Sequence, residues 1–168
     1  LWNILIKIGV KGNILTTLKA MYASVLSCVR CNNEMTNYFE CLQGLKQGCL
    51  ASPTLFSFLI NELAAEIITK GKHGIQLTPG EIEFVIFMFA DDIALLSQTP
   101  VGLQSQLDSL QLTAEKLGLV VNQDKSKIIV FRNGGFLSKA EKWFFGGNQL
   151  QVVNRYKYLG LNFSPRLS

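Results

Sequence analysis

Hydrophobic residues recur at helical spacing in three parts of the chain. Residues 1–24 predict two helical pieces with a break at Gly9–Gly12. A wide apolar stripe over 52–70 predicts a longer helix, with Ser52 as its N-cap and a proline at the first helical position. Apolar residues that step by four and three over 103–117 predict another helix, which ends at a glycine.

Short apolar runs between these helices predict strands. Residues 25–31 and 37–42 form one predicted hairpin. Residues 83–89 predict a strand covered on both faces, because 84–89 are continuously apolar or aromatic, and an apolar run resumes at 93–96 after two acids. Further short strands are predicted at 119–121, at 128–131 and within 143–163. This order predicts an α+β fold with its helices on one face of a sheet.

Composition narrows the class of protein. The chain has 168 residues, enough for one ordinary domain, and 48% hydrophobic residues with 17% charged residues exclude a disordered tail. The apolar runs are well short of the roughly 20 residues that span a membrane, so no membrane partner is expected. The low charged fraction fits a buried sheet, or a surface that meets the rest of a longer chain.

Charge is unevenly distributed along the sequence. Residues 125–168 carry eight Lys or Arg against one acid, whereas residues 1–124 carry eight against eleven. A basic C-terminal quarter suits an anionic partner such as nucleic acid. The alternative is an ordinary solvated face, which charge alone favours.

Asp91 and Asp92 are the main candidates for chemistry. They lie side by side between two very hydrophobic segments, where a turn allows both carboxylates to reach one side. Two carboxylates held together favour a cation between them, and magnesium prefers oxygen ligands and phosphate substrates. The alternative interpretation is a plain Asp-rich turn.

Four segments resemble, in order, the boxes of reverse transcriptases, above all those of non-LTR (LINE-type) retrotransposons and group II introns. Phe89-Ala90-Asp91-Asp92 resembles the Phe/Tyr-Ala-Asp-Asp catalytic box. The other three segments resemble the Gln-Gly box with its Ser-Pro, the Leu-Gly box with its lysines, and the Tyr-x-Tyr-Leu-Gly segment, at 47–53, 117–127 and 156–160.

The resemblance implies a polymerase palm, a ferredoxin-like antiparallel sheet with helices on one face. It implies fingers and palm-adjacent elements at 1–46, the palm core at 47–133, and the end of the palm and start of the thumb at 134–168. It further implies RNA-templated DNA synthesis from a DNA primer and deoxynucleoside triphosphates, with two Mg²⁺ ions. The upstream fingers and downstream thumb are expected in missing parts of a longer polyprotein.

The resemblance also assigns roles to residues. Asp91 is expected to be the direct metal ligand and Asp92 the weaker or second-sphere partner. Either Lys125 or Lys127 is expected to act on the leaving pyrophosphate, with Lys125 as the catalytic candidate and Lys127 near the nucleotide. Residues expected at the nucleotide and template are Gln47, Gly48, Phe89 and Ala90. Residues expected at the primer are Arg155, Tyr156, Lys157, Tyr158, Leu159 and Gly160.

Ordinary structural roles compete with several of these assignments. Gln47 and Gly48 also suit a helix-entry turn, two lysines before a strand are often solvent-facing, and alternate tyrosines also pack on a small sheet. The family's first acidic box, which supplies another metal-binding aspartate, lies upstream of the segment that Leu1 begins. An incomplete metal site and impaired catalysis are therefore expected. Two alternatives remain: a remnant that at most binds nucleic acid, and an unrelated α+β module.

Overall fold

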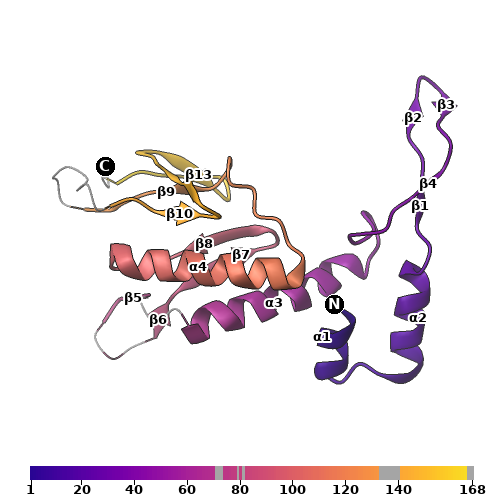
Figure 1. The fold of residues 1–168 in the computed structure, drawn as a ribbon, viewed down its shortest axis with the longest axis horizontal. Coiled ribbons are helices and arrows are strands. Elements are labelled where there is room, and N and C mark those ends of the chain that lie inside the picture. The colour runs from indigo at the N-terminus through magenta and orange to yellow at the C-terminus, as the bar shows by residue number, and fades with distance from the viewer. Residues whose placement is uncertain (71–73, 79, 81, 133–140, 166–168) are drawn as a thin grey trace. The chain divides into compact units, whose positions relative to one another are not determined.

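The structure is a computed structural model that describes residues 1–70, 74–78, 80, 82–132 and 141–165. The chain divides into two compact units, residues 1–62 and residues 63–168. The boundary between them falls within helix α3 (Figure 1). Each unit is described by itself below. The functional division predicted at residues 46 and 133 remains a prediction.

The first unit begins with two helices, as the sequence predicts. Helix α1 spans Trp2–Lys7 and α2 spans Gly12–Tyr22. A hairpin follows, in which β1 (Leu26–Ser27) pairs with β4 (Phe39–Glu40) and β2 (Arg30–Cys31) pairs with β3 (Glu34–Met35). Its tip is Asn32-Asn33, both with positive φ, a backbone that asparagine tolerates better than most residues.

Helix α3 spans Ser52–Lys70, so the predicted segment is confirmed but the predicted N-cap is wrong. Ser52 is already helical, because the carbonyl of Ala51 accepts the first helical bond, from Leu55 N at 3.0 Å. The Ser52 hydroxyl instead donates to the carbonyl of Lys46 at 2.8 Å. Its side chain therefore ties the preceding connector to the helix start. The predicted glycine stop, Gly71, lies outside the described residues.

The second unit contains helix α4, Pro100–Leu117. Thr99 caps it by accepting a hydrogen bond from Gly102 N at 3.1 Å, and Gly118 ends it at φ 69°. Around it lie paired strands: β5 (Ile75–Gln76) with β6 (Glu83–Phe84), β7 (Ile86–Phe89) with β8 (Asp92–Leu95), β9 (Lys127–Ile128) with β12 (Gln151–Val152), β10 (Phe144–Phe145) with β11 (Asn148–Gln149), and β13 (Tyr156–Tyr158) with β14 (Leu161–Phe163).

One hydrophobic core holds the second unit together. Helix α4 contributes Leu107, Leu110 and Ala114, and the β7–β8 hairpin packs on this cluster from the side of Ile86 and Ile93. The remaining buried members come from the second half of α3, from later strands and from the residues that adjoin them: Leu63, Ile67, Val85, Ile128, Trp143, Phe145 and Leu150. Burial of such side chains stabilises the fold by roughly 1.5–3 kcal/mol each.

One strand prediction is wrong, and the palm sheet remains a prediction. The β9–β12 ladder is parallel, with Gln151 opposite Lys127, while the other ladders of the described residues are antiparallel. Residues 119–121 pair with no strand, although Leu119 and Val121 pack on the core and Val120 between them is 97% exposed. The coarse α+β class holds, with mixed helices and small sheets.

The β7–β8 hairpin is also less covered than its sequence predicts. Phe87 and Phe89 remain 49% and 65% exposed, while Ile86 and Ile93 pack against the core. Only one face of the hairpin is therefore packed within the second unit, and the other presents aromatic rings. Within the described part of the chain, no helix has the length and apolar character needed to cross a membrane.

Candidate functional site: an aspartate turn held beside a tyrosine hairpin

The two aspartates occupy a tight turn in the second unit. Strand β7 pairs with β8 so that Phe89 lies opposite Asp92, which leaves Ala90 and Asp91 as the loop. Ala90 adopts φ 52°, a backbone that costs an L-alanine free energy and that hairpin turns usually assign to glycine or asparagine. The turn therefore holds Asp91 and Asp92 in a conformation that local preference alone does not favour.

Register places Asp92 on the exposed face of the hairpin. Directly paired residues share a face, so Asp92 lies with Phe89, and Ala94 lies with Phe87. Asp91 and Asp92 are both exposed. Among the described residues, neither carboxylate makes a hydrogen bond or ion pair, which leaves both oxygen pairs available to a ligand.

Tyr158 contacts this turn from the β13–β14 hairpin. Its phenol donates to the backbone carbonyl of Asp92 at 3.3 Å, although the two residues are 66 positions apart. Partial burial, and then the negative charge of Asp92, raise the pKa of the Tyr158 phenol. The phenol therefore stays protonated and able to donate over the whole neutral range.

Tyr156 makes the equivalent contact with the lysine segment. Its phenol donates to the carbonyl of Lys125 at 2.8 Å. The same turn is closed locally, because Asn122 Oδ1 accepts from Lys125 N at 3.1 Å. The ammonium of Lys127 donates to the carbonyl of Asp124 at 2.6 Å, and Lys127 is half-buried while Lys125 is exposed. The two lysines thus differ in what their amines already bind.

The residues of segment 155–160 differ in their exposure to solvent. Along β13, Tyr156 and Tyr158 are half-buried and Lys157 between them is exposed, as strand alternation requires. Leu159 and Gly160 form the turn to β14, at φ 49° and 84°. Arg155 is exposed before the strand. The two basic residues therefore point to solvent, whereas both phenols face the protein.

Gln47 and Gly48 belong to the first unit, where they are exposed at a turn that leads into α3. The next residue, Cys49, lies beside the helix start. The backbone N–H of Ala51 lowers the pKa of the Cys49 thiol, desolvation opposes that effect, and the hydroxyls of Ser52 and Tyr22 lower the pKa further. The Tyr22 hydroxyl also lies 2.9 Å from the Ser52 hydroxyl, which fixes this corner.

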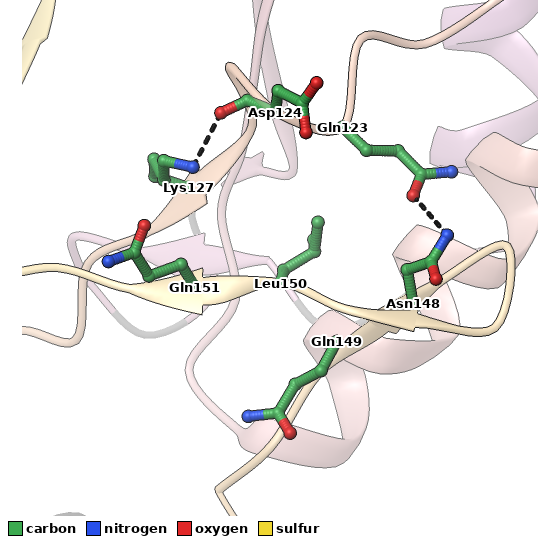
Figure 2. A pocket seen from close by; sticks show the side chains of 7 residues that line it. All are labelled: Gln123, Asp124, Lys127, Asn148, Gln149, Leu150 and Gln151. Atoms are coloured by element: carbon green, nitrogen blue, oxygen red, sulfur yellow. Dashed lines mark hydrogen bonds between the residues drawn. The ribbon is translucent and has the colours of Figure 1, made fainter.

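A polar pocket of about 370 Å³ opens beside Lys127 (Figure 2). Asn148 Nδ2 donates to Gln123 Oε1 at 2.8 Å across one side of it, and Leu150 forms an apolar part of its lining. The remaining lining residues are Asp124, Gln149 and Gln151. This pocket lies on the β9, β11 and β12 side of the unit and includes neither residue of the aspartate pair.

Two contacts at the site escape sequence reasoning. Gln106 of α4, a buried residue, donates to the carbonyl of Leu96 at 2.9 Å, just beyond β8. The hydroxyl of Tyr158 reaches the backbone, not the carboxylate, of Asp92. A polar residue inside the apolar stripe of α4 is the only sequence signal for the first contact. Nothing in the sequence pattern signals the second.

The donor set at the turn fits part of a magnesium site. Carboxylate oxygens are the ligands that Mg²⁺ prefers, and the two at the turn have no competing protein partner among the described residues. In the described part of the chain, no group of three or more His, Cys, Asp or Glu is arranged to hold a metal ion. Asp91 and Asp92 would thus hold such an ion with two carboxylates.

Comparison with known families identifies the class of protein to which this chain belongs. Residues 1–163 match the family described as reverse transcriptase (RNA-dependent DNA polymerase). The match covers nearly the whole chain, from α1 to the end of β14. The chain belongs to the reverse transcriptase family, whose fold is of the palm type.

Individual relatives are proteins of non-LTR retrotransposons. The Retrovirus-related Pol polyprotein from type-1 retrotransposable element R2 of Popillia japonica is 25% identical over 93% of this chain and 26% of its own length. The corresponding polyprotein from type-2 element R2DM of Drosophila melanogaster is 28% identical over 73% of this chain and 12% of its own. The transposon TX1 149 kDa protein of Xenopus laevis is 29% identical over 65% of this chain and 8% of its own length. The chain therefore spans about a quarter or less of these relatives.

Proposed function

We propose that this chain is the palm segment of an RNA-directed DNA polymerase, which transfers nucleotides onto a primer 3′ hydroxyl over an RNA template. The observation that carries the proposal is the tight turn at Ala90-Asp91, which presents two unpartnered carboxylates in a chain of the reverse transcriptase family. Bound divalent cations would supply charge stabilisation for the attacking and leaving oxygens.

The described residues support distinct roles around that turn. Asp91, in the loop itself, is the proposed direct metal ligand, and Asp92 is the partner. Exposed Phe89 lies on the same hairpin face as Asp92, where its ring can support a primer end or a base pair. Ala90 has no side chain beyond a methyl group, so it leaves this approach open.

Lys125 is the better candidate for the leaving pyrophosphate. Its side chain is exposed, and among the described residues its ammonium has no hydrogen-bond or ion-pair partner. The Lys127 ammonium, by contrast, is already bound to the Asp124 carbonyl. Gln47 and Gly48 are proposed at the incoming nucleotide and template, and Arg155 and Lys157 are proposed to contact primer phosphates.

Metal-directed cleavage tests the aspartate turn without requiring turnover. Fe²⁺ bound in place of Mg²⁺ generates hydroxyl radicals that cut the backbone nearby, and peptide mapping locates the cuts. We expect cuts close to residues 89–93. Asp91→Asn should weaken Fe²⁺ binding by more than about tenfold, because a ligand charge is lost. Asp108→Asn, an exposed aspartate of α4, is the matched control and should keep the wild-type pattern. Cleavage elsewhere, or cleavage that survives Asp91→Asn, would contradict the proposal.

A second candidate is a chain that binds nucleic acid without catalysis. The observation that favours it is that the described metal ligands at the turn number only two, Asp91 and Asp92. Primer extension on an RNA template with Mg²⁺ distinguishes the two. Incorporation by this chain that Asp91→Asn abolishes would establish the polymerase, at a rate we expect to be low. Template binding without incorporation would establish the second candidate.

A further inference from the structure

The β13–β14 hairpin makes two contacts of the same kind with two separate loops. The Tyr156 hydroxyl donates to the carbonyl of Lys125, and the Tyr158 hydroxyl donates to the carbonyl of Asp92. These acceptors lie 31 and 66 residues away in sequence. Each acceptor belongs to a residue to which the proposed function assigns chemistry. Both bonds end on backbone carbonyls, so they fix where the loop runs and leave the side chains of Asp92 and Lys125 free.

We propose that Tyr156 and Tyr158 are positioning residues, which hold the aspartate turn and the lysine turn in a fixed relation to each other. The proposal rests on the proposed function for its catalytic meaning. In this proposal the two phenols bind the protein's own backbone, and Arg155 and Lys157 are the residues of this segment that contact the primer. Neither phenol is then a catalytic residue, because neither touches the reacting atoms.

The geometry of the hairpin supports this assignment. Residues two apart on a strand point the same way, so Tyr156 and Tyr158 share one face of β13. That face is partly covered, since the ring of Tyr158 meets the ring of Phe163 edge-on with centroids 6.5 Å apart. Both tyrosines are half-buried, which limits the rotation of each phenol and directs its hydroxyl. An aromatic side chain reserved for a nucleic acid would instead be free on the exposed face with Lys157.

The turns that receive these bonds need external support. Ala90 sits at φ 52° in the aspartate loop, so the loop does not hold this conformation by local preference. The lysine turn is closed by the Asn122 side chain and continues into β9, a strand of only two residues. A hydrogen bond from outside each turn selects one conformation from those that a short loop can adopt.

Removing each hydroxyl alone gives a specific test. Tyr158→Phe and Tyr156→Phe keep the rings and delete only the donors, and Tyr38→Phe, an exposed tyrosine of the first unit, is the matched control. Hydrogen–deuterium exchange of the whole chain, read by mass spectrometry, is the first readout. We expect Tyr158→Phe to raise exchange in peptides covering 86–96, and Tyr156→Phe to raise it in peptides covering 122–130. The 2.8 Å bond should give the larger change, on the order of fivefold, because it is the shorter one.

Ligand affinities separate positioning from primer contact. We expect Tyr158→Phe to weaken Mn²⁺ binding, followed by the free-ion EPR signal, by a few-fold, and to leave the dissociation constant for a primer–template duplex within about twofold. Lys157→Gln should do the reverse. Tyrosine variants that weaken duplex binding while exchange at both turns stays at the wild-type level would overturn the proposal.

The outcome also distinguishes this inference from the proposed function. If the wild-type chain binds neither Mn²⁺ nor duplex, the proposed function fails, yet the two exchange patterns still test whether the phenols hold the two turns. If Mn²⁺ binds at the aspartate turn but Tyr158→Phe changes neither exchange at 86–96 nor Mn²⁺ affinity, the positioning role fails alone. A spread of faster exchange over the whole second unit would indicate general destabilisation, and would also overturn the specific role.

Discussion

At the scale of single residues, Ala90 carries the backbone cost of the aspartate turn. Its φ of 52° is one that glycine adopts freely and alanine does not. The side chains on either side of it, Phe89 and Asp91, are the ones that the proposed function uses. The local conformation is therefore maintained by the flanking strands and by the hydrogen bond from Tyr158, and not by the residue itself.

Replacing Ala90 with glycine should stabilise the chain. We expect Ala90→Gly to raise the free energy of unfolding by about 0.5–1 kcal/mol, because relief of the positive φ exceeds the entropy that glycine adds to the unfolded state. Urea denaturation followed by circular dichroism measures this. Ala94→Gly, in the strand β8, is the control and should lower stability by a similar amount. Equal losses for both variants would show that Ala90 is not strained.

Cys49 is a second residue whose environment sets its chemistry. The N–H of Ala51 and the hydroxyl of Ser52 stabilise the thiolate, so the thiol ionises at a lower pH than an ordinary cysteine. We expect the pH midpoint of its alkylation by iodoacetamide, followed by peptide mass spectrometry, to lie below that of an ordinary exposed cysteine. Ser52→Ala should move that midpoint upward, since a polar hydroxyl beside the thiolate is lost.

Thr54→Ala is the control for this measurement, because Thr54 is exposed in the first turn of the same helix. Its midpoint should match that of the wild type. A Ser52→Ala variant whose Cys49 midpoint is unchanged would contradict the role of the hydroxyl and leave the backbone N–H as the main cause.

At the scale of elements, the sequence predicts helices better than strands. The four-and-three spacing of α4 is confirmed over 103–117, because one apolar face of a helix must meet the core. Residues 119–121 show why strands are harder: Leu119 and Val121 are partly buried without any ladder, so alternate burial alone does not require strand pairing. The continuous apolar character of 84–89 also failed to indicate that one face of the hairpin stays exposed.

The start of α4 offers a quantitative test at this scale. Thr99 accepts from Gly102 N at 3.1 Å, so Thr99→Ala should lower the free energy of unfolding by about 1 kcal/mol. Thr99→Asp keeps an oxygen acceptor and places negative charge at the helix N-terminus, so it should retain wild-type stability. Urea denaturation of the whole chain measures both. Loss of stability in both variants would indicate that packing, and not capping, is the role of Thr99.

The sequence predicts some features of the candidate site and not others. Adjacent acids between apolar runs indicate a turn with carboxylates, and the structure places Asp91 and Asp92 at such a turn. The contacts of Tyr156 and Tyr158 were beyond prediction, because a hydrogen bond to a backbone carbonyl depends on tertiary packing and leaves no trace in the identity of the acceptor residue. Lys125 and Lys127 could likewise be separated only by the contact that Lys127 makes.

At the scale of the whole molecule, the uneven charge predicts salt-dependent binding. Residues 125–168 carry a net charge of +7, eight basic residues against one acid. We expect affinity for an RNA–DNA primer–template to fall as salt rises, with Lys157→Gln reducing the slope of log Kd against log salt by about 1. Fluorescence anisotropy over a salt series measures the slope. Lys19→Gln, an exposed lysine of α2, should leave it unchanged, and equal effects of both variants would indicate diffuse attraction.

The spacing of the two phenols along β13 sets the distance between the two loops that they contact. Alternate side chains on a strand repeat at about 6.6 Å, so a strand that anchors two loops through residues i and i+2 sets how far apart those loops can be. Only one residue, Lys157, separates the anchors. One inserted residue would turn one ring to the opposite side, whereas an exchange of Lys157 itself would leave the interval intact. Length, more than side-chain identity, is what this stretch of the sequence must preserve.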